Sequence, residues 1–468
     1  MKSIQRILAA LALCAALTLP IASCSNFLNL PPLQDLEASG ALSNGVGVET
    51  AISGTYQVIR NGSLYAGNLI SMNELFGDHM KPRTENLDFQ SSMISSRNLN
   101  FFNGTGRDSW GDAYAGINRA NNVLAALPKV TDMTDAVKRR AEGEVLFLRG
   151  ILYFALVRWF GLPWGTTADN SQLGVVLRLE ATTSPVAESS KKRSTVAEVY
   201  TQIIADLRRA EELLPAPGGS TAIPGRATKW SAAAFLARVY FQQGNYTTAA
   251  EAASRVIASN SYRLNAGFEQ FGETAKRNVE ENIFEVQNTV DQNTNGAGNA
   301  MRFDGFSAPF LSLSNSFRTV YNAFPANDKR KQLLFVEDSG ELYCKKYDAF
   351  IMNIPVVRLA EMYLTRAESR AESGDAAGAL ADVNIVRQRA GIPNLTGLSG
   401  AALLDAIRNE RIMELACEGD RFNNLKRMRQ SVGNPVSTEA PLPWNSSRLI
   451  FKIPDTEMSA NRLAEQNP

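Results

Sequence analysis

The chain has 468 residues, and its 48 Lys and Arg residues against 47 Asp and Glu residues give a formal net charge of only +1. A chain so nearly neutral lacks the basic surplus that attracts proteins to polyanions, so we do not expect nucleic-acid binding. Its 44% hydrophobic and 20% charged residues are typical of a folded globular protein. His79 is the only histidine. This excludes sites that need two histidine ligands and leaves Ser–His or Cys–His catalysis a single possible base.

The first residues predict export. Two basic residues precede an apolar run over residues 7–19, which is short for a membrane span and has the place of the hydrophobic part of a signal peptide. The sequence Ile-Ala-Ser-Cys at residues 21–24 resembles the lipobox of bacterial lipoproteins. We therefore predict a signal peptide over residues 1–23 and lipidation of Cys24 as the mature N-terminus. The alternative is an ordinary secretory signal cut near Ala22, which leaves Cys24 as a spare thiol.

A tether is predicted after the cysteine, and helices after the tether. Residues 24–47 contain Pro31-Pro32 with scattered Gly and Ser, which favours an extended linker. The clearest helix begins at Thr195, whose hydroxyl can cap the first turn while Glu198 reaches back to the backbone. Strand patterns are few and short. Other helical patterns run over residues 110–127, 137–160, 227–243, 247–258, 357–373, 377–390 and 401–418.

Two of these helix pairs are alike. Residues 237–249 and 367–379 each place a glycine, Gly244 or Gly374, followed by Asn or Asp between one helix and the next. The glycine permits a tight turn, and small residues on both sides let the helices approach each other. The pattern is similar to tetratricopeptide repeats of roughly 34 residues. We predict a mostly α fold, namely a degenerate tetratricopeptide-repeat helical scaffold with long irregular ligand-binding loops.

These patterns also predict the domain organisation. Residues 48–468 form a single domain, with repeat helices mainly in residues 107–270 and 355–428. Between them, residues 289–354 lose the helical pattern and are rich in Asn, Gly, Ser and Phe, which indicates a loop-rich insert. Residues 429–468 form a C-terminal loop region.

Several motifs resemble the SusD/RagB family of outer-membrane nutrient-binding lipoproteins, over essentially the whole mature chain. The most specific are Asp-Val-Asn-Ile-Val-Arg-Gln-Arg-Ala-Gly at residues 382–391 and Ile-Arg-Asn-Glu-Arg-Ile-Met-Glu-Leu-Ala-Cys-Glu-Gly-Asp-Arg at residues 407–421. The other matching stretches are Cys24-Ser-Asn-Phe-Leu-Asn-Leu-Pro-Pro, residues 110–121, 144–163 and 225–240, Asp328-Lys329-Arg330, and residues 453–468.

The resemblance implies a binding protein and not an enzyme, with no cofactor. It implies a lipid anchor in the outer membrane, facing the cell exterior, and a place as a lid over a SusC-like TonB-dependent transporter. The implied ligands are oligosaccharides or, in some relatives, peptides. The repeat helices would hold the transporter and the irregular loops would hold the ligand. One departure concerns export to the surface, because Asn26 and Asn29 stand where relatives often carry Asp.

Candidate ligand-binding residues are aromatic and polar side chains outside the helical pattern. Aromatic rings stack on the faces of sugars, and Asp, Asn and Arg bracket sugar hydroxyls. For each aromatic ring taken singly, packing or loop anchoring is the alternative to ligand contact. The candidates are Asp78, Arg83, Arg97, Phe101, Phe102 and Asn103, then Phe303, Phe306 and Phe310, and finally Trp444. Aromatic residues within the helical pattern are expected in the core instead, namely Trp110, Tyr114, Tyr153, Phe154, Trp159 and Trp230.

Other functions remain open on the residues alone. The Asn- and Phe-rich stretch after residue 289 could suit a peptide ligand. Glu410 and Glu414 lie four apart on one helix face and could suggest glycosidase acid/base chemistry, although helix salt pairing is commoner. A plain helical-repeat scaffold for other envelope proteins is a further alternative. His79 beside Asp78 is interpreted as an exposed loop pair, and no metal-ligand spacing is present, although loop Asp and Asn residues could hold calcium.

The cysteine count adds one expectation. Only Cys344 and Cys417 remain once the signal peptide and the lipidated residue are set aside. Both stand in apolar surroundings, which favours two buried thiols over a single disulfide.

Overall fold

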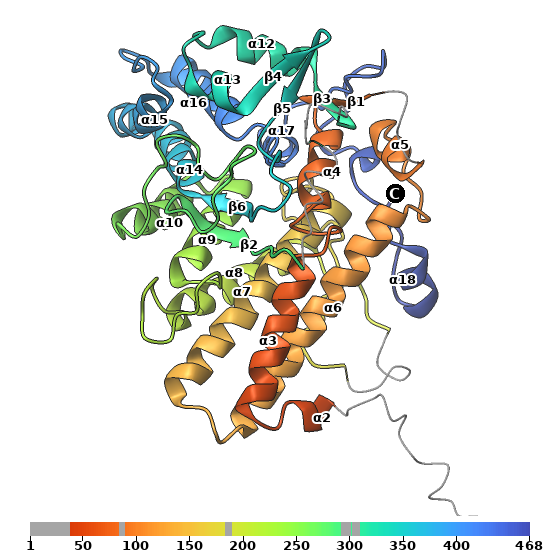
Figure 1. Ribbon diagram of the computed structural model, residues 1–468. Coiled ribbons are helices and arrows are strands. Elements are labelled where there is room, and N and C mark those ends of the chain that lie inside the picture. The colour runs from red at the N-terminus through yellow and green to blue at the C-terminus, as the bar shows by residue number, and fades with distance from the viewer. Residues whose placement is uncertain (1–37, 84–88, 183–189, 292–300, 302–308) are drawn as a thin grey trace, which may run out of the picture. The chain divides into compact units, whose positions relative to one another are not determined.

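The computed structural model describes residues 38–83, 89–182, 190–291, 301 and 309–468 (Figure 1). The chain divides into two units, residues 1–41 and residues 42–468. The described part of the first unit is a single short helix, α2 (Ala38–Ala41). All the other described helices and strands belong to the second unit. It begins directly before α3, and so before residue 48, where the sequence predicted the start of the domain.

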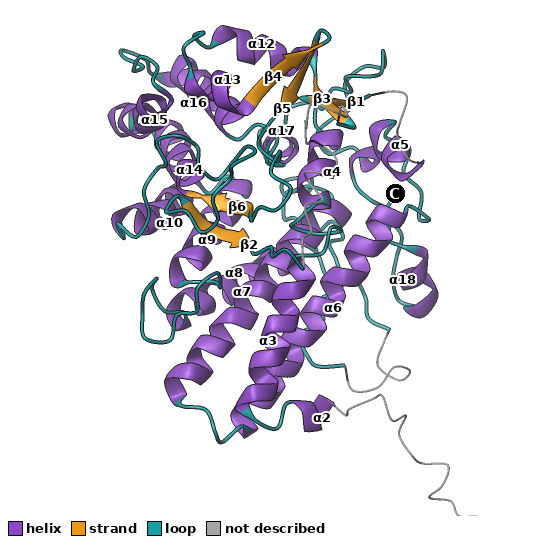
Figure 2. Ribbon diagram, in the orientation of Figure 1, coloured by secondary structure: helices purple, strands orange, loops and turns teal. Residues whose placement is uncertain are grey.

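Helices dominate this unit, as predicted (Figure 2). Those of its first half are α3 (Gly45–Ile59), α4 (Asn68–Phe76), α5 (Phe89–Ser95), α6 (Gly104–Ala126), α7 (Asp135–Phe160), α8 (Val196–Leu213), α9 (Lys229–Gln242) and α10 (Tyr246–Ala258). Those of its second half are α12 (Asn315–Ala323), α13 (Lys329–Leu334), α14 (Leu359–Glu372), α15 (Ala376–Ala390), α16 (Gly400–Glu414), α17 (Arg421–Arg427) and α18 (Asp455–Ala460). Short 3-10 turns follow α6 (Leu127–Lys129) and precede α18 (Ser447–Leu449).

The long helices pack side by side in chain order. Each of α3, α6, α7, α8, α9 and α10 contacts the next, and α10 then contacts α14, which contacts α15 and α16 (Figure 1). From Arg140 onward α7 is buried on almost every side, because neighbouring helices cover it all round. The succession of antiparallel neighbours is the arrangement that the repeat pattern predicted.

Local sequence signals fix the ends of these helices. Thr195 and Glu198 form the predicted capping box, in which the Thr195 hydroxyl accepts from the Glu198 N–H at 3.1 Å and Glu198 Oε2 accepts from the Thr195 N–H at 2.8 Å. The two predicted repeat turns are also confirmed. Gly244 and Gly374 have φ of +73° and +86°, a left-handed conformation that favours glycine. The following Asn or Asp then caps the next helix.

Strands are confined to two small antiparallel sheets (Figure 2). One is a pair, β2 (Asn282–Val286) with β6 (Ile354–Arg358), set among the helices. The other has the order β1-β3-β5-β4, built from β1 (Met80–Pro82), β3 (Leu311–Leu313), β5 (Glu341–Cys344) and β4 (Phe335–Asp338). The described part of the expected loop-rich insert is therefore largely ordered secondary structure. Its strands are too short, at three to five residues, to show a period-two pattern in the sequence.

Buried ion pairs join this sheet region to the repeat helices. Arg330, on α13, is fully buried and contacts Asp328 at 2.7 Å and Glu410 of α16 at 2.5 Å. Glu414, one turn further along α16, accepts hydrogen bonds from Arg358 at the end of β6 and from Arg389 of α15. Four separate elements therefore meet at one charged cluster in the interior.

The predicted core is largely confirmed. Trp110, Tyr153, Phe154 and Trp159 are buried, whereas Tyr114 and Trp230 are half-buried and pack against the core from its edge. The predicted thiols are also found, since Cys344 and Cys417 are both buried and free. None of the described helices has both the length and the apolar character that a membrane span requires.

Candidate ligand-binding surface

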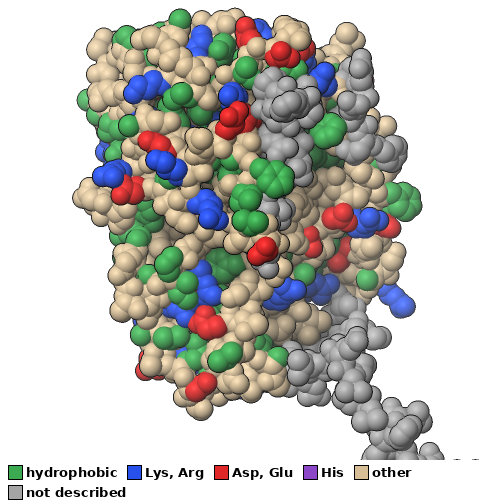
Figure 3. All heavy atoms as spheres, viewed as in Figure 1, with side chains coloured by type: hydrophobic (Ala, Val, Ile, Leu, Met, Phe, Trp, Pro, Cys, Tyr) green, Lys and Arg blue, Asp and Glu red, His purple; other side chains and the backbone are tan. Residues whose placement is uncertain are grey.

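Most of the described candidate residues flank two places in the fold, namely the strands β1 and β3 of the four-stranded sheet and the segment between α5 and α6 (Figure 1). Hydrophobic side chains on the face shown in Figure 3 are interspersed with charged ones and do not form one large apolar patch. Single exposed hydrophobic side chains are normal in such surroundings, so an exposed aromatic ring is informative only where another lies beside it.

Phe101 and Phe102 form an exposed aromatic pair. Their side chains are 44% and 60% exposed, and their ring centroids lie 4.2 Å apart at an interplanar angle of 41°. The backbone beneath them is fixed, because the Phe101 carbonyl accepts from the Asp455 N–H at 3.2 Å and the Phe102 N–H donates to the Asn100 side chain at 2.9 Å. The pair is thus a solvent-facing aromatic platform on an anchored backbone, of the kind that suits the apolar face of a sugar.

Asn103, next to this pair, has a structural role. It is 3% exposed and caps α6, where its Oδ1 accepts from the Gly106 N–H at 3.0 Å. The prediction that it contacts ligand is corrected. An Asn before a helical pattern is a capping signal, and the sequence interpretation had started that helix six residues too late, at Trp110.

Arg97 is corrected as well. It is 2% exposed, and its guanidinium donates to the carbonyls of Leu75, Phe76 and Gly77 at 2.6–3.1 Å. These carbonyls end α4, so the cation satisfies acceptors that the helix leaves unpaired at its C-terminus. Burial lowers the pKa of Arg97 to about 10.

Asp78 is tied to the scaffold. Its carboxylate accepts two hydrogen bonds from Arg421 of α17, at 2.8 and 2.9 Å. Burial alone would raise the pKa of Asp78, but the hydrogen bonds from Arg421 hold it below its usual value. His79 is 5% exposed, packs edge-on against Phe317, and has its pKa lowered to about 3 by burial. The interpretation of His79 as an exposed loop residue is therefore wrong.

Arg83 and Phe310 lie together at the edge of the four-stranded sheet. The Arg83 N–H donates to the Phe310 carbonyl at 2.9 Å and so extends the pairing of β1 with β3. Arg83 is exposed, and the Phe310 side chain is 49% exposed. Both stay predicted ligand residues. Phe303 and Phe306 lie outside the described residues.

Trp444 is half-buried, and the guanidinium of Arg429 lies 5.4 Å from its ring centroid. A backbone bridge between Val432 and Leu442 fixes the loop that carries it. It also remains a predicted ligand residue.

The sequence interpretation missed one exposed aromatic residue. Phe350, between β5 and β6, is 69% exposed. Beyond the end of the β2–β6 pair, Asn288 hydrogen-bonds Asn353 and Met352, and Val290, two residues further along the chain, is 77% exposed. The sequence contains only one indication of an exposed ring here, namely an aromatic residue in a polar stretch. Phe350 had been assigned to the loop-rich insert and not to the candidate residues.

The carboxylate pair considered for glycosidase chemistry is not at a surface. Glu410 and Glu414 are both fully buried and paired with arginines. Burial alone would raise the pKa of Glu414, but the surrounding guanidinium groups of Arg389, Arg358 and Arg330 hold it well below its usual value. A carboxyl group held ionised and shielded from solvent cannot serve as a general acid for a glycan.

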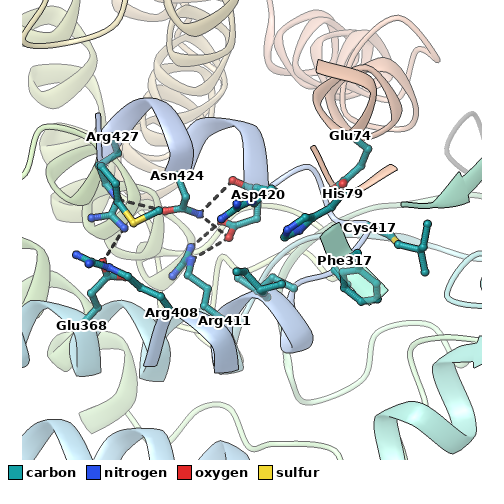
Figure 4. A pocket seen from close by; sticks show the side chains of 16 residues that line it. Glu74, His79, Phe317, Glu368, Arg408, Arg411, Cys417, Asp420, Asn424 and Arg427 are labelled. Carbon is teal, nitrogen blue, oxygen red and sulfur yellow. Dashed lines mark hydrogen bonds and ion pairs between the residues drawn. The ribbon is translucent and has the colours of Figure 1, made fainter. Parts of the chain in front are cut away.

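A pocket lined by residues of α4, α12, α14, α16 and α17 has charged side chains that pair with one another (Figure 4). Asp420 accepts from Arg411 at 2.7 and 2.8 Å, and Glu368 accepts from Arg408 and Arg427 at 2.9 and 2.8 Å. These charged side chains are therefore paired with one another. Among the described residues, no group of three or more His, Cys, Asp or Glu side chains could hold a metal ion.

Comparison with known proteins identifies the class. A family model described as "Starch-binding associating with outer membrane" matches residues 27–241, and the model of the SusD family matches residues 345–468. The chain belongs to the SusD/RagB family.

Individual relatives match along nearly the whole chain. SusD-like protein P2 of Formosa agariphila is 26% identical, over 97% of this chain and 98% of the relative. A solved SusD superfamily protein from Bacteroides thetaiotaomicron is 25% identical, with a TM-score of 0.79 over 91% of this chain and 100% of that chain. A SusD-like carbohydrate binding protein from Bacteroides vulgatus has the same fold, at 23% identity and a TM-score of 0.77, over 90% of this chain and 97% of that chain.

Proposed function

We propose that this protein is a lipid-anchored, surface-facing outer-membrane subunit that binds oligosaccharides and delivers them to a SusC-like TonB-dependent transporter. The family supports the class, since one of its matched models describes starch-binding proteins that associate with the outer membrane. The observation that carries the ligand is the Phe101–Phe102 pair, two adjacent exposed rings on a fixed backbone. Aromatic platforms of this kind recognise uncharged polyols by stacking.

The binding prediction concerns this pair. We expect a soluble form beginning at Ser25 to bind one glycan class, and a Phe101→Ala/Phe102→Ala double variant to bind it at least about tenfold more weakly, because each lost stacking contact costs about 1 kcal/mol. The thermal midpoint should stay unchanged, because both side chains already face solvent. Isothermal titration calorimetry against plant, host and microbial glycans, with a peptide digest alongside, measures this.

Matched controls locate the site. Leu333→Ala removes an apolar side chain that is 47% exposed on α13 and should leave affinity unchanged. Phe350→Ala tests the exposed aromatic that the sequence interpretation missed. Loss of affinity in that variant alone would move the site to the β2–β6 end. Heat with the peptides only would replace the glycan by a peptide ligand, and a Phe101/Phe102 variant with undiminished glycan affinity would refute the aromatic platform.

The anchor prediction concerns Cys24, which lies outside the described residues. Replacing Cys24 by Ser removes the thiol that the lipobox interpretation acylates. We expect the variant to lose incorporation of labelled palmitate and to leave the outer-membrane fraction, whereas Cys344→Ser should retain both. Membrane fractionation with fatty-acid labelling checks this, and unchanged labelling of the Cys24 variant would show that lipid is attached elsewhere or not at all.

The partner is tested separately. Detergent extraction of the native membrane, followed by affinity capture of this chain, should retain a large TonB-dependent barrel protein at a fixed stoichiometry. Capture of soluble envelope proteins alone would instead favour the helical-scaffold alternative.

A further inference from the structure

A second, polar cavity lies in the interior, next to the pocket of Figure 4 and bordered by several of the same residues. Side chains from α4, α7, α9, α14 and the turn before α17 line it, and it has room for a few water molecules. Three arginines and three carboxylates border it. They are Arg158, Arg238, Arg411, Glu361, Glu418 and Asp420.

All but one of these charges are compensated. Arg238 makes a bidentate pair with Glu361, and Arg411 makes one with Asp420. Glu418 accepts from Arg358 and from Lys346. Each carboxylate that borders the cavity therefore already forms an ion pair with a cationic side chain of the protein.

Arg158 is the exception. Its Nε donates to the Phe154 carbonyl of its own helix at 3.2 Å, and its guanidinium lies 4.0 Å from the Phe154 ring centroid. Within the part of the chain that the structure describes, no carboxylate oxygen lies within 4.0 Å of this guanidinium. Burial lowers the pKa of Arg158 and Arg238 lowers it too, whereas Tyr65, Tyr200 and Glu361 partly oppose the decrease.

A second basic side chain, Lys426, lies close to Arg158, and burial lowers its pKa to about 7. The Lys426 ammonium donates to the Arg158 carbonyl at 2.8 Å and lies 4.5 Å from the Phe422 ring centroid. It, too, forms no ion pair with any described residue. Arg158 therefore borders the cavity without a carboxylate partner of its own among the described residues.

We propose that this cavity binds a small anion, a halide or a carboxylate of the size of formate, on the guanidinium of Arg158. The planar guanidinium presents its Nη donors as a fork that matches such an anion. The buried Asn423 Oδ1 at the cavity wall has no hydrogen-bond partner in the structure. A water molecule bound together with the anion would donate to that oxygen. This inference does not depend on the proposed function, because the cavity shares no residue with the exposed aromatic pair.

Anomalous diffraction is the direct test. Crystals of the mature chain grown without halide and soaked in sodium bromide should give an anomalous peak within hydrogen-bonding distance of the Arg158 Nη atoms. Crystals of Arg158→Met should lack that peak and keep bromide elsewhere. Wild-type crystals with well-defined water and no bromine signal in the cavity would overturn the proposal, whether or not the variant folds.

A solution test uses thermal unfolding. At constant ionic strength, replacing the bulky anion gluconate by formate or bromide should raise the thermal midpoint of the wild-type chain to a plateau, because an anion bound only by the folded state stabilises it. Arg158→Met should lose this response. Arg209→Met, which removes a cation that is 47% exposed, should retain it. Equal responses in all three proteins would refute specific binding at Arg158.

Discussion

Replacing Glu414 by Gln is expected to lower the free energy of unfolding by about 3–5 kcal/mol. The carboxylate is fully buried, and it accepts hydrogen bonds from Arg330, Arg358 and Arg389. The neutral amide would leave three guanidinium groups in the interior with one fewer anion, and an uncompensated buried charge is costly. Urea unfolding of the soluble chain, followed by circular dichroism, measures the change.

The matched control is Glu142→Gln. Glu142 also pairs with an arginine, Arg209, at 3.1 Å, but both side chains are substantially exposed. Its loss should cost no more than about 1 kcal/mol. If both variants lost similar small amounts of stability, the interior cluster would contribute no more than a surface ion pair, and its role in joining the sheet region to the repeats would have to be abandoned.

The second large effect is a pH-dependent change in the free energy of unfolding, and it is expected from Glu74. Glu74, on α4, is 2% exposed, and its Oε1 accepts from the Gly419 N–H at 2.7 Å. Burial raises the pKa of Glu74 to about 8, even though the hydrogen bond from Gly419 opposes the rise. The folded protein therefore keeps this carboxyl protonated at neutral pH, whereas the unfolded chain ionises it.

The sign of the effect follows from this difference. The stability that the neutral carboxyl contributes is fully present below its unfolded pKa of 4.5, and it is lost as the pH rises from there to about 8. Glu74→Gln cannot ionise and keeps the oxygen that accepts from Gly419. Between pH 4 and pH 7, the stability of the variant relative to wild type should therefore rise by roughly 3 kcal/mol.

Measuring unfolding free energies of both proteins at pH 4, 5.5 and 7 gives this difference directly. Other titrating groups cancel in the comparison, because the two chains share them. A difference that stays constant over this range would show that Glu74 is ionised in the folded protein.

Local signals in the sequence predicted much of the scaffold. The Thr195 capping box and the glycines at positions 244 and 374 each depend on only a few consecutive residues, and each was found as predicted. The four-stranded sheet was not predicted. Its strand β1 pairs with β3 more than two hundred residues away, so its stability comes from contacts that no local window contains.

Which candidate ligand residues are exposed also depends on contacts between distant elements. Phe101 and Phe102 are exposed, as a binding role needs, whereas Arg97 and Asn103 from the same stretch are buried. Phe, Arg and Asn are all suitable for binding sugars, so composition could not distinguish these four residues. Arg97 was excluded by its position at the C-terminus of α4, and Asn103 by its position at the N-terminus of α6.

The sequence by itself determined the class of this protein through a helical-repeat scaffold and the family motifs at residues 382–391 and 407–421, both of which are encoded in contiguous residues. The export signal stays a prediction from the first residues. Only the tertiary structure decided which polar groups face solvent and which are buried in the interior. Charged residues such as Glu414 and Arg158 are expected on the surface of amphipathic helices. Glu414 instead lies in a buried cluster of ion pairs, and Arg158 borders a cavity without a carboxylate partner among the described residues. The reason is that burial and charge pairing depend on elements brought together from distant parts of the chain.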